Sequence, residues 1–478
     1  MVVGAGLAGL AAAWFLTQDV PRGGPGAIGR ITVLEQAPQV GGKLALGEVA
    51  GVVVDTGAES LLARRPEAVE LARAVGLGDD LVAPETTRAA LWSRGRMVSL
   101  PAGQVMGVPG NPRALAASGL LTPFELLRVG LDPLLPAPGD AGDVSVGGYV
   151  ARRLGRAVVD RLVDPLLGGV YAGRADLLSL DATLPQLAPA AHRGGSLLTA
   201  TQEVLARAAA STGPVFAGIA GGVGRLPVAL AAALSAPGRG DQAPVVEIRT
   251  RTTVRELVGT ATGFRVVTGS TRHPEVLEAD AVVVAAPAHH AARLLATVAP
   301  TAATELAGIE YASTVLVTFA LALASMPGSL SGSGLLVPAV DGRAVKAATF
   351  SSNKWGWMAA AAPGLAVVRA SLGRYGDEAV LARPDEELAE LALGELAHAL
   401  GVRDRPVDTS VTRWGGALPQ YQVGHVERVR RACEAVAAVP GLAVAGAAYH
   451  GVGIPAVIAS ARQAARQVGA GTPTDRRP

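Results

Sequence analysis

Residues 1–16 read MVVGAGLAGLAAAWFL, and this stretch decides the fold. A two-residue apolar strand, Val2-Val3, is followed by the pattern G-x-G-x-x-G and then by an Ala- and Leu-rich helix. In a dinucleotide-binding fold the first glycine makes the tight turn, the second lets the backbone approach a pyrophosphate, and the third lets the helix pack on the sheet. The helix N-terminus adds amide donors and a positive dipole end. The residues predicted to line this phosphate-binding turn are Gly4, Ala5, Gly6, Leu7, Ala8 and Gly9.

The next strand, ITVLEQ at residues 31–36, places Glu35 at its end and Gln36 directly after it. A carboxylate at that position accepts hydrogen bonds from a ribose diol and repels a 2′-phosphate. A turn that binds nothing and a surface glutamate are the alternatives for each feature taken alone. Together the two features favour an adenine dinucleotide bound at the end of the first two strands.

The sequence after Glu35 favours a flavin over a nicotinamide. VGGK at residues 40–43 adds a second Gly-Gly turn, and a hairpin around residues 47–51 leads into VDTGAES at 54–60. The E-x(5)-GG arrangement resembles the FAD-binding signature of amine oxidase-like flavoproteins. A purely structural hairpin and a solvated Lys43 are the alternatives, whereas the cofactor reading places Lys43 near the flavin edge. The residues assigned to FAD here are Gly41, Gly42, Lys43, Gly57, Ala58, Glu59 and Ser60.

The end of the chain carries a second candidate flavin contact. LAVAGAAYHGVGIPAVIASA at residues 442–461 reads as a strand, a glycine-rich loop and a helix that begins near Pro455. Amides at that helix start suit the pyrimidine end of an isoalloxazine, where negative charge develops on reduction. An ordinary strand-loop-helix crossover is the alternative, and His450 is a weak candidate for proton handling. The residues assigned to FAD here are Gly446, Val452, Gly453 and Ile454.

Composition excludes several classes of function. The 42 basic and 40 acidic residues give a net charge of only +2, so no large field attracts nucleic acid. Cys433 is the single cysteine, which excludes an internal disulfide and a cysteine-based metal site and fits a reducing cytoplasm. The adjacent His289 and His290 are expected to point apart and bind no metal. We expect no secretory signal and no membrane span, and leave peripheral membrane contact open.

A chain of 478 residues is long enough for more than one lobe, and dinucleotide-domain patterns occur at both of its ends. We therefore expect an α/β fold: a discontinuous Rossmann-like FAD-binding domain, a mixed-sheet substrate domain and an inserted helical subdomain. The predicted division gives the FAD-binding domain residues 1–84, 211–295 and 431–470, the substrate domain 85–110 and 296–430, the helical subdomain 111–210, and a polar tail 471–478.

Four longer stretches of sequence indicate which family of flavoproteins the chain resembles. VDTGAESLLARRPEAVELARAVGL, PLLGGVYAGRADLLSLDATLPQL, VTRWGGALPQYQVGHVERV and GAAYHGVGIPAVIASARQAA resemble, in order, the signature blocks of the porphyrinogen oxidases. SLPAGQVMGVPGN resembles the Gram-positive type that oxidises coproporphyrinogen III to coproporphyrin III. The resemblance implies removal of six electrons through FAD in three two-electron steps, with O2 reduced to H2O2. It also implies a place in haem biosynthesis, and pathway logic suggests a downstream ferrochelatase as partner.

The resemblance further implies individual site residues. Val254 stands where the family binds adenine through a strand residue's backbone, and Trp414 stands within a block assigned to FAD. For the substrate, an apolar cleft with cations for the propionates is expected. The candidates are Arg88, Tyr171, Lys354 and Arg374. Each candidate also has an interpretation without a functional role. Arg88 would be a surface arginine, Tyr171 a core residue, and Lys354 and Arg374 solvated cations.

Several alternatives stay open. Protoporphyrinogen IX is the close rival as substrate, and an amine oxidase or carotenoid desaturase is a more distant one. A non-catalytic escort or dissociation-inhibitor-like protein of the same fold is the rival from another class. The first strand is shorter than the family's, which leads us to expect that a few upstream residues are missing. The loop from Asp19 to Arg30 is longer and richer in glycine than usual, and is expected to be mobile.

Overall fold

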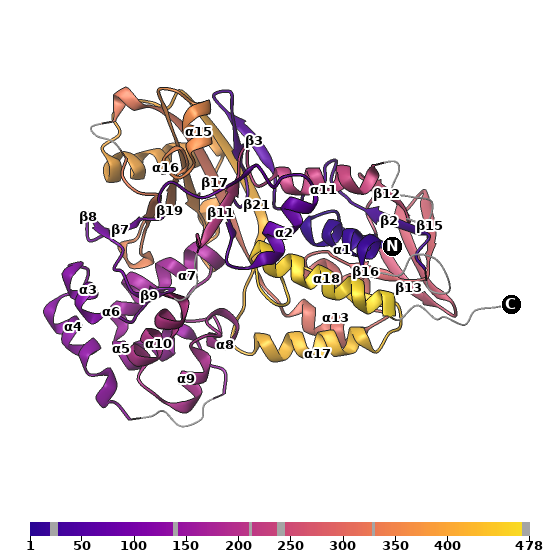
Figure 1. Cartoon of the computed structure of the whole chain (residues 1–478), viewed down its shortest axis with the longest axis horizontal. Helices are drawn as coiled ribbons and strands as arrows, with labels where there is room; N and C mark the ends of the chain where they lie inside the picture. Colours follow the sequence, from indigo (N-terminus) through magenta and orange to yellow (C-terminus); the bar gives the residue numbers. More distant parts are fainter. Residues whose placement is uncertain (20–26, 137–141, 210–212, 237–243, 327–329, 471–478) are drawn as a thin grey trace.

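The opening strand of the chain lies inside a parallel five-stranded sheet (Figure 1). The structure is a computed structural model that describes residues 1–19, 27–136, 142–209, 213–236, 244–326 and 330–470. Most of the predicted loop between Asp19 and Arg30, and the tail 471–478, lie outside these residues. The sheet has the order β12-β2-β1-β16-β22. Its strands are β1 (Val2–Val3), β2 (Arg30–Leu34), β12 (Val245–Arg249), β16 (Val282–Val284) and β22 (Leu442–Val444), all parallel.

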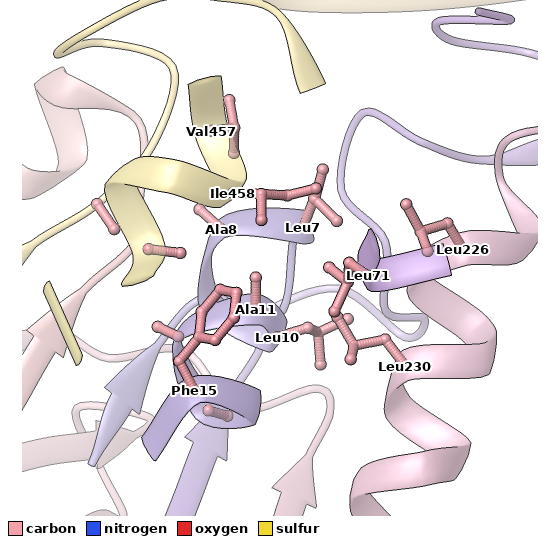
Figure 2. Close-up of a cluster of buried hydrophobic side chains, with 14 of the residues drawn as sticks. Leu7, Ala8, Leu10, Ala11, Phe15, Leu71, Leu226, Leu230, Val457 and Ile458 are labelled. Atoms are coloured by element: carbon pink, nitrogen blue, oxygen red, sulfur yellow. The ribbon is translucent and has the colours of Figure 1, made fainter. Parts of the chain in front are cut away.

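Helices cover one face of this sheet. One of them, α1, is apolar on almost every side and lies in the middle of the layer. Figure 2 shows Leu7, Leu10 and Phe15 of α1 packed toward Leu230 of α11 and Ile458 of α18. Burial on every side explains why α1 lacks the amphipathic pattern of a surface helix. The helices of this layer are α1 (Leu7–Gln18), α2 (Pro66–Ala74), α11 (Arg225–Ser235) and α18 (Ile454–Ala470).

The other face of the sheet packs on a second layer, whose core includes Val3, Val284, Leu306 and Val429. This layer contains α12 (Ala288–Leu295), α13 (Pro300–Ala307) and α17 (His425–Ala437), with an antiparallel sheet of β13 (Glu256–Thr260), β14 (Gly263–Gly269) and β15 (Pro274–Ala279). The sequence-based division gave α13 and the first part of α17 to the substrate domain. The apolar face of an amphipathic helix does not indicate which sheet the helix will cover, so the sequence pattern could not assign these two helices to a domain.

A mixed seven-stranded sheet forms the second lobe, at the upper left of Figure 1. Helix α16 (Asp385–Leu400) covers one face of it through Leu388, Ala392 and Leu396. The strand order is β21-β17-β20-β19-β18-β7-β8. The bounds are β7 (Ala89–Ser93), β8 (Arg96–Ser99), β17 (Tyr311–Ala322), β18 (Gly334–Leu336), β19 (Val345–Phe350), β20 (Leu365–Leu372) and β21 (Asp408–Pro419).

Residues 112–136 and 142–209 form the helical region at the lower left of Figure 1, in agreement with the predicted helical subdomain. Its core contains Leu115, Tyr149, Leu162 and Leu167. Its helices are α3 (Pro112–Ala117), α4 (Pro123–Gly130), α5 (Val146–Leu154), α6 (Arg156–Val158), α7 (Asp164–Tyr171), α8 (Leu180–Thr183), α9 (Ala188–Arg193) and α10 (Leu197–Ala209). Among the described helices, none combines the length and apolar character needed to cross a membrane.

Two tight hairpins occur in the described part of the first hundred residues, and the first of them confirms the hairpin predicted around residues 47–51. β3 (Leu46–Val49) pairs with β4 (Val52–Asp55) around Ala50-Gly51, and β7 pairs with β8 around Arg94-Gly95. All four turn residues have positive φ, between 50° and 76°. Two central residues of positive φ are the mark of a type I′ turn, whose twist matches the flanking strands. The remaining short strands are β5 (Leu61–Leu62), β6 (Leu81–Val82), β9 (Gln104–Val105), β10 (Val108–Pro109) and β11 (Phe216–Ile219), and the remaining short helices are α14 (Ser351–Lys354) and α15 (Gly356–Ala361).

Candidate active site

Two glycines of the turn between β1 and α1, Gly4 and Gly9, leave no room for a side chain. Gly4 has φ +101°, and its amide donates to the Leu34 carbonyl at 2.7 Å. A Cβ added to Gly9 would lie 1.8 Å from the Gly4 carbonyl oxygen. The glycines therefore let the helix start directly above the strand ends, where its amides face outward. The first turn of α1 contains no acidic residue that would oppose a phosphate.

Three separate stretches of sequence meet at this turn. The Gly41 amide donates to the Ala5 carbonyl at 2.9 Å, and a Cβ on Gly42 would lie 3.1 Å from the Gly6 Cα. The Glu35 carboxylate accepts from the Ala5 amide at 2.7 Å through one oxygen and from the Ala37 amide at 2.8 Å through the other. Each oxygen has a second lone pair, so the carboxylate can still accept from a ribose diol.

The predicted adenine contact, Val254, follows a segment that lies beside Glu35. The Thr252 amide donates to the Glu35 carbonyl at 2.7 Å, and the Arg251 amide donates to the Ala37 carbonyl. The segment that leads to Val254 therefore lies beside Glu35. Val254 itself packs against the core that contains Val3 and Leu34. Gln36 is exposed beyond the strand end.

Lys43 connects the second glycine turn to the substrate-side sheet. Its Nζ donates to the Gly416 carbonyl at 2.8 Å and lies 5.2 Å from the centre of the Tyr311 ring. Burial lowers the pKa of Lys43 to about 8. The Tyr311 hydroxyl in turn accepts from the Ala288 amide at the start of α12. The ammonium is thus held at a fixed place beside the predicted phosphate-binding turn.

The stretch 57–60 is fastened to the seven-stranded sheet through Glu59. Its carboxylate pairs with Lys354 at 3.0 Å and with Arg369 at 2.5 Å, and also accepts from the Ser351 hydroxyl at 2.9 Å. Burial alone would raise the pKa of Glu59, but the two cations outweigh it and lower the pKa to about 2. A second Arg369 nitrogen donates to the Gly57 carbonyl at 2.6 Å. Lys354 also donates to the Ser60 hydroxyl, while Ala58 is exposed.

Two further contacts complete this edge of the site. The Trp414 indole donates to the Thr56 carbonyl at 2.6 Å, which ties β21 to the stretch that follows β4. Asp55, at the end of β4, accepts from the amides of Val223 and Gly224 at 2.9 and 2.8 Å. Burial raises the pKa of Asp55 to about 6, although these two amides oppose the shift.

The C-terminal loop, residues 446–453, leads into α18 and faces open space at its start. Gly446 has φ +138°, and a Cβ there would meet no atom within 4 Å. The Gly446 amide donates to the Ser460 hydroxyl at 3.0 Å, and Val452 packs against the core of the helical region. Ile454 is the first residue of α18, whose first turn has no acidic residue. His450 lies largely exposed on this loop, and partial burial lowers its pKa.

The donor set of these segments fits FAD. Glycine backbone lines both ends, neither helix start is acidic, a fixed ammonium stands beside the turn, and the loop at Gly446 opens onto free space. A long dianionic dinucleotide with an aromatic ring system at one end matches this combination of amides, cation and open backbone.

A band of partly exposed side chains crosses the middle of the seven-stranded sheet. Registered neighbours run in one row through Thr412, Leu316, Ser371, Ala347 and Leu336. The alternate residues on the same strands are buried against α16. Most strand pairs of this sheet are antiparallel, and such sheets commonly pack one face on the core and leave the other accessible, so partial exposure of Leu, Ala and Ser here shows that this face is not fully covered.

The band lies between α7 and the stretch 57–60. At one end a Cβ on Gly169 of α7 would lie 3.3 Å from Leu336. Near its middle, Arg369, two residues before Ser371 on β20, reaches Gly57. The row is therefore uncharged, and it passes beside the predicted flavin stretch.

The four predicted substrate residues occupy different situations. Arg88 is exposed just before β7, and its carbonyl is held by Ser333. Tyr171 is buried at the end of α7, and burial raises its pKa to about 12. Lys354 is paired with Glu59, as described above. Arg374 donates to the carbonyls of Arg343 and Val337 at 2.9 and 3.0 Å.

One expectation about side-chain direction is wrong. The rings of His289 and His290 do not point apart: their centres lie 4.1 Å from each other. They stand at the start of α12, where His290 hydrogen bonds to Arg293 and His289 packs edge-on against Tyr311. Local partners therefore override the simple spacing rule. Among the described residues, no group of three or more potential ligands could hold a metal ion.

Sequence reasoning missed two residues that organise the site. Arg369 lies in an otherwise apolar strand, and a lone charge in such a strand is the signal that could have found it. Tyr421 follows β21, and its hydroxyl contacts both Ala447 and Gly451 of the C-terminal loop. Nothing in the local pattern of Gln420 to Gly424 reveals that contact, because its partners lie about 30 residues further along the chain.

Comparison with known proteins gives consistent matches along the chain. The model of the family described as flavin containing amine oxidoreductase matches residues 7–469. The coproporphyrinogen III oxidase of Mycobacterium tuberculosis (strain ATCC 25618 / H37Rv) is 35% identical over 98% of this chain and 96% of its own length. The enzyme of the same name from Bacillus subtilis (strain 168) is 30% identical over 95% and 94%. A crystal structure from Exiguobacterium sp. 255-15, provisionally assigned as a protoporphyrinogen oxidase, superimposes with a TM-score of 0.82 at 31% identity, covering 98% of each chain.

Proposed function

The chain belongs to the flavin containing amine oxidoreductase family and, within it, to the porphyrinogen oxidases, and from that premise we propose that it oxidises coproporphyrinogen III to coproporphyrin III. FAD is the cofactor of this flavin-containing family. Membership of an oxidoreductase family favours an enzyme over the non-catalytic binding protein considered from the sequence. The observation that carries the proposal is the partly exposed, uncharged band on the seven-stranded sheet, which passes beside the stretch 57–60.

The reaction balances with molecular oxygen as the oxidant. One coproporphyrinogen III loses six hydrogens, and three O2 molecules are reduced to three H2O2. FAD, when bound, supplies the redox chemistry by accepting two electrons at a time. Removal of six electrons would therefore take three such two-electron oxidations.

The protein's own residues provide binding and orientation. The uncharged floor of Leu316, Ser371 and Ala347 suits a large apolar macrocycle, because it imposes no buried charge against the ring. Fixing of Gly57 and Glu59 by Arg369 keeps the flavin stretch at a constant distance from that floor. Such positioning is the contribution that a protein makes when the cofactor performs the chemistry.

Propionate binding remains a prediction for the four candidates. Arg88 fits the role best, because its guanidinium is exposed and a planar fork suits a carboxylate. Tyr171 suits the cleft wall, since it ends α7 at the edge of the band. Lys354 and Arg374 already donate to Glu59 and to backbone carbonyls, so a substrate carboxylate would have to share those donors.

Protoporphyrinogen IX is the second candidate substrate, favoured by the name of the Exiguobacterium structure. The two are separated by supplying each porphyrinogen to flavin-loaded protein under air and following the fluorescent product. We expect a higher kcat/KM for coproporphyrinogen III. Faster turnover of protoporphyrinogen IX would reverse the assignment, and turnover of neither would overturn the porphyrinogen oxidase proposal.

The surroundings of the enzyme also remain predictions. We expect a ferrochelatase to receive the porphyrin product, and we keep a cytoplasmic location with peripheral membrane contact as the working hypothesis. A pull-down with purified ferrochelatase that recovers no complex would count against a direct transfer between the two proteins.

A further inference from the structure

A single buried hydroxyl bridges the two ends of the C-terminal loop. The Tyr421 side chain is 1% exposed, and its hydroxyl donates to the Ala447 carbonyl at 2.5 Å. The same oxygen accepts from the Gly451 amide at 2.9 Å. Residues 447 and 451 are thereby held at a fixed separation by one side chain that belongs to a different part of the chain.

The loop needs such a restraint because it contains two permissive backbone positions. Gly446 has φ +138° and Gly451 has φ +135°, conformations that side-chain-bearing residues rarely adopt. The Ser460 hydroxyl fixes the Gly446 amide, and the Tyr421 hydroxyl fixes the Gly451 amide. Removal of the Tyr421 hydroxyl would leave a half-buried donor and a half-buried acceptor without this partner, which favours a rearranged loop.

The Tyr421 ring is itself rigidly held. It stacks on His425 with 3.8 Å between ring centres and 16° between ring planes, and lies 5.7 Å from the Tyr171 ring. Its own carbonyl accepts from the Ser179 amide at 2.7 Å, which anchors it to the helical region. The contacts with His425 and Ser179 therefore fix the position of the hydroxyl. The contact with Tyr171 connects the same ring to the proposed substrate cleft.

We propose that Tyr421 is a positioning residue that forms the C-terminal loop in advance, so that the start of α18 is already aligned for the flavin before FAD binds. This inference rests on the proposed function, because it takes residues 452–454 as flavin contacts. A preformed loop lowers the ordering cost of cofactor binding and keeps the helix amides aimed at one place on the ring.

Tyr449 provides a matched control on the same loop. Its side chain is also buried, at 4% exposed, but its hydroxyl has no hydrogen-bond partner among the described residues. Tyr421→Phe and Tyr449→Phe therefore remove the same atom from the same neighbourhood, and only the first removes hydrogen bonds. The Kd for FAD, measured by fluorescence titration of flavin-free protein, is expected to rise tenfold or more in Tyr421→Phe and less than twofold in Tyr449→Phe.

Two further readouts separate alignment from general stability. The midpoint potential of the bound flavin should become more negative in Tyr421→Phe, because the helix amides no longer stabilise the reduced ring as well, and should be unchanged in Tyr449→Phe. In the wild-type protein, hydrogen exchange of residues 446–453 should be slow both with and without FAD. Full exchange of this segment in the flavin-free wild type would overturn the proposal, even if Tyr421→Phe failed to fold.

Failure of this inference is distinguishable from failure of the proposed function. If the wild type takes up no FAD, the flavoprotein assignment fails. If the wild type binds FAD and Tyr421→Phe binds it equally well with an unchanged potential, only the role of Tyr421 is contradicted.

Discussion

The two ends of the proposed flavin site are built in opposite ways. At the glycine turn, close backbone contacts fix the geometry, since a Cβ on Gly9 would lie 1.8 Å from the Gly4 oxygen. At the C-terminal loop the backbone is open, since a Cβ on Gly446 would meet nothing within 4 Å, and side chains from elsewhere hold it. At the first end, the tightest contact joins residues only five positions apart. The second depends on contacts across 14 and 30 residues.

The largest expected effect comes from breaking the locally determined end. Gly9→Ala should destabilise the fold by roughly 5 kcal/mol and abolish FAD retention, because backbone must move to admit the methyl group. Gly394→Ala is the matched control, since Gly394 also lies within a helix but has open space around its Cβ. It should stabilise the protein by up to about 1 kcal/mol. Thermal unfolding and flavin absorbance measure both, and equal effects of the two changes would contradict the packing argument.

The next effect is expected where side chains from the second lobe hold the flavin stretch. Arg369→Met should cost about 3 kcal/mol, because it leaves the buried Glu59 carboxylate with an incomplete set of partners. It should also weaken FAD binding, since Gly57 loses its donor. Arg430, whose ion pairs with Glu427 and Glu434 are exposed, is the control, and Arg430→Ala should leave both properties unchanged. Denaturant unfolding measures the change in stability, and FAD titration measures the change in binding. An Arg369→Met protein as stable as the wild type would contradict the proposed role of Arg369 in holding Glu59 and Gly57.

A smaller effect on stability is expected from the titration of His425, whose ring stacks on the Tyr421 ring. Burial lowers the pKa of His425 to about 4 from its usual 6.5, so the unfolded chain binds the extra proton first as the pH falls. Stability should therefore be lost on acidification, by about 2 kcal/mol between about pH 7.5 and pH 5. Asp55, whose pKa is raised to about 6, acts with the opposite sign, so the wild type must be compared with a variant.

His425→Phe provides that comparison, because it keeps a ring against Tyr421 and removes the titrating group. The difference in unfolding free energy between wild type and variant should shift by the same amount over this pH range. A difference that does not change with pH would show that folding leaves the pKa of His425 unchanged.

The smallest effect concerns the exposed candidate for the substrate's carboxylates. Arg88→Ala should raise KM for coproporphyrinogen III roughly fivefold, about 1 kcal/mol, with kcat little changed, because an exposed charge pair contributes modestly to uniform binding. Arg113, an exposed arginine at the start of α3, is the control, and Arg113→Ala should leave KM as it is. An unchanged KM in Arg88→Ala would leave that residue as part of the surface.

The sequence predicts the parts of this molecule that depend on local patterns. The glycine turn, the strand that ends at Glu35, the hairpin around residues 47–51 and the helix after the C-terminal loop follow from residue types at short spacing. The contact between Lys43 and Gly416 spans 373 residues, and the pair of Glu59 with Arg369 spans 310. No local pattern contains those distances, which is why the predicted role of Lys354 as a free cation did not foresee its ion pair with Glu59.

The central claim is that segments from both ends of the chain assemble a flavin site that takes electrons from a porphyrinogen. Anaerobic titration of the FAD-loaded protein with coproporphyrinogen III tests it most directly. We predict that visible flavin absorbance is lost as fluorescent coproporphyrin III forms, with about three flavins reduced for each porphyrinogen, since the reaction transfers six electrons and each flavin takes two. Flavin that stays oxidised in the presence of excess coproporphyrinogen III would contradict the account.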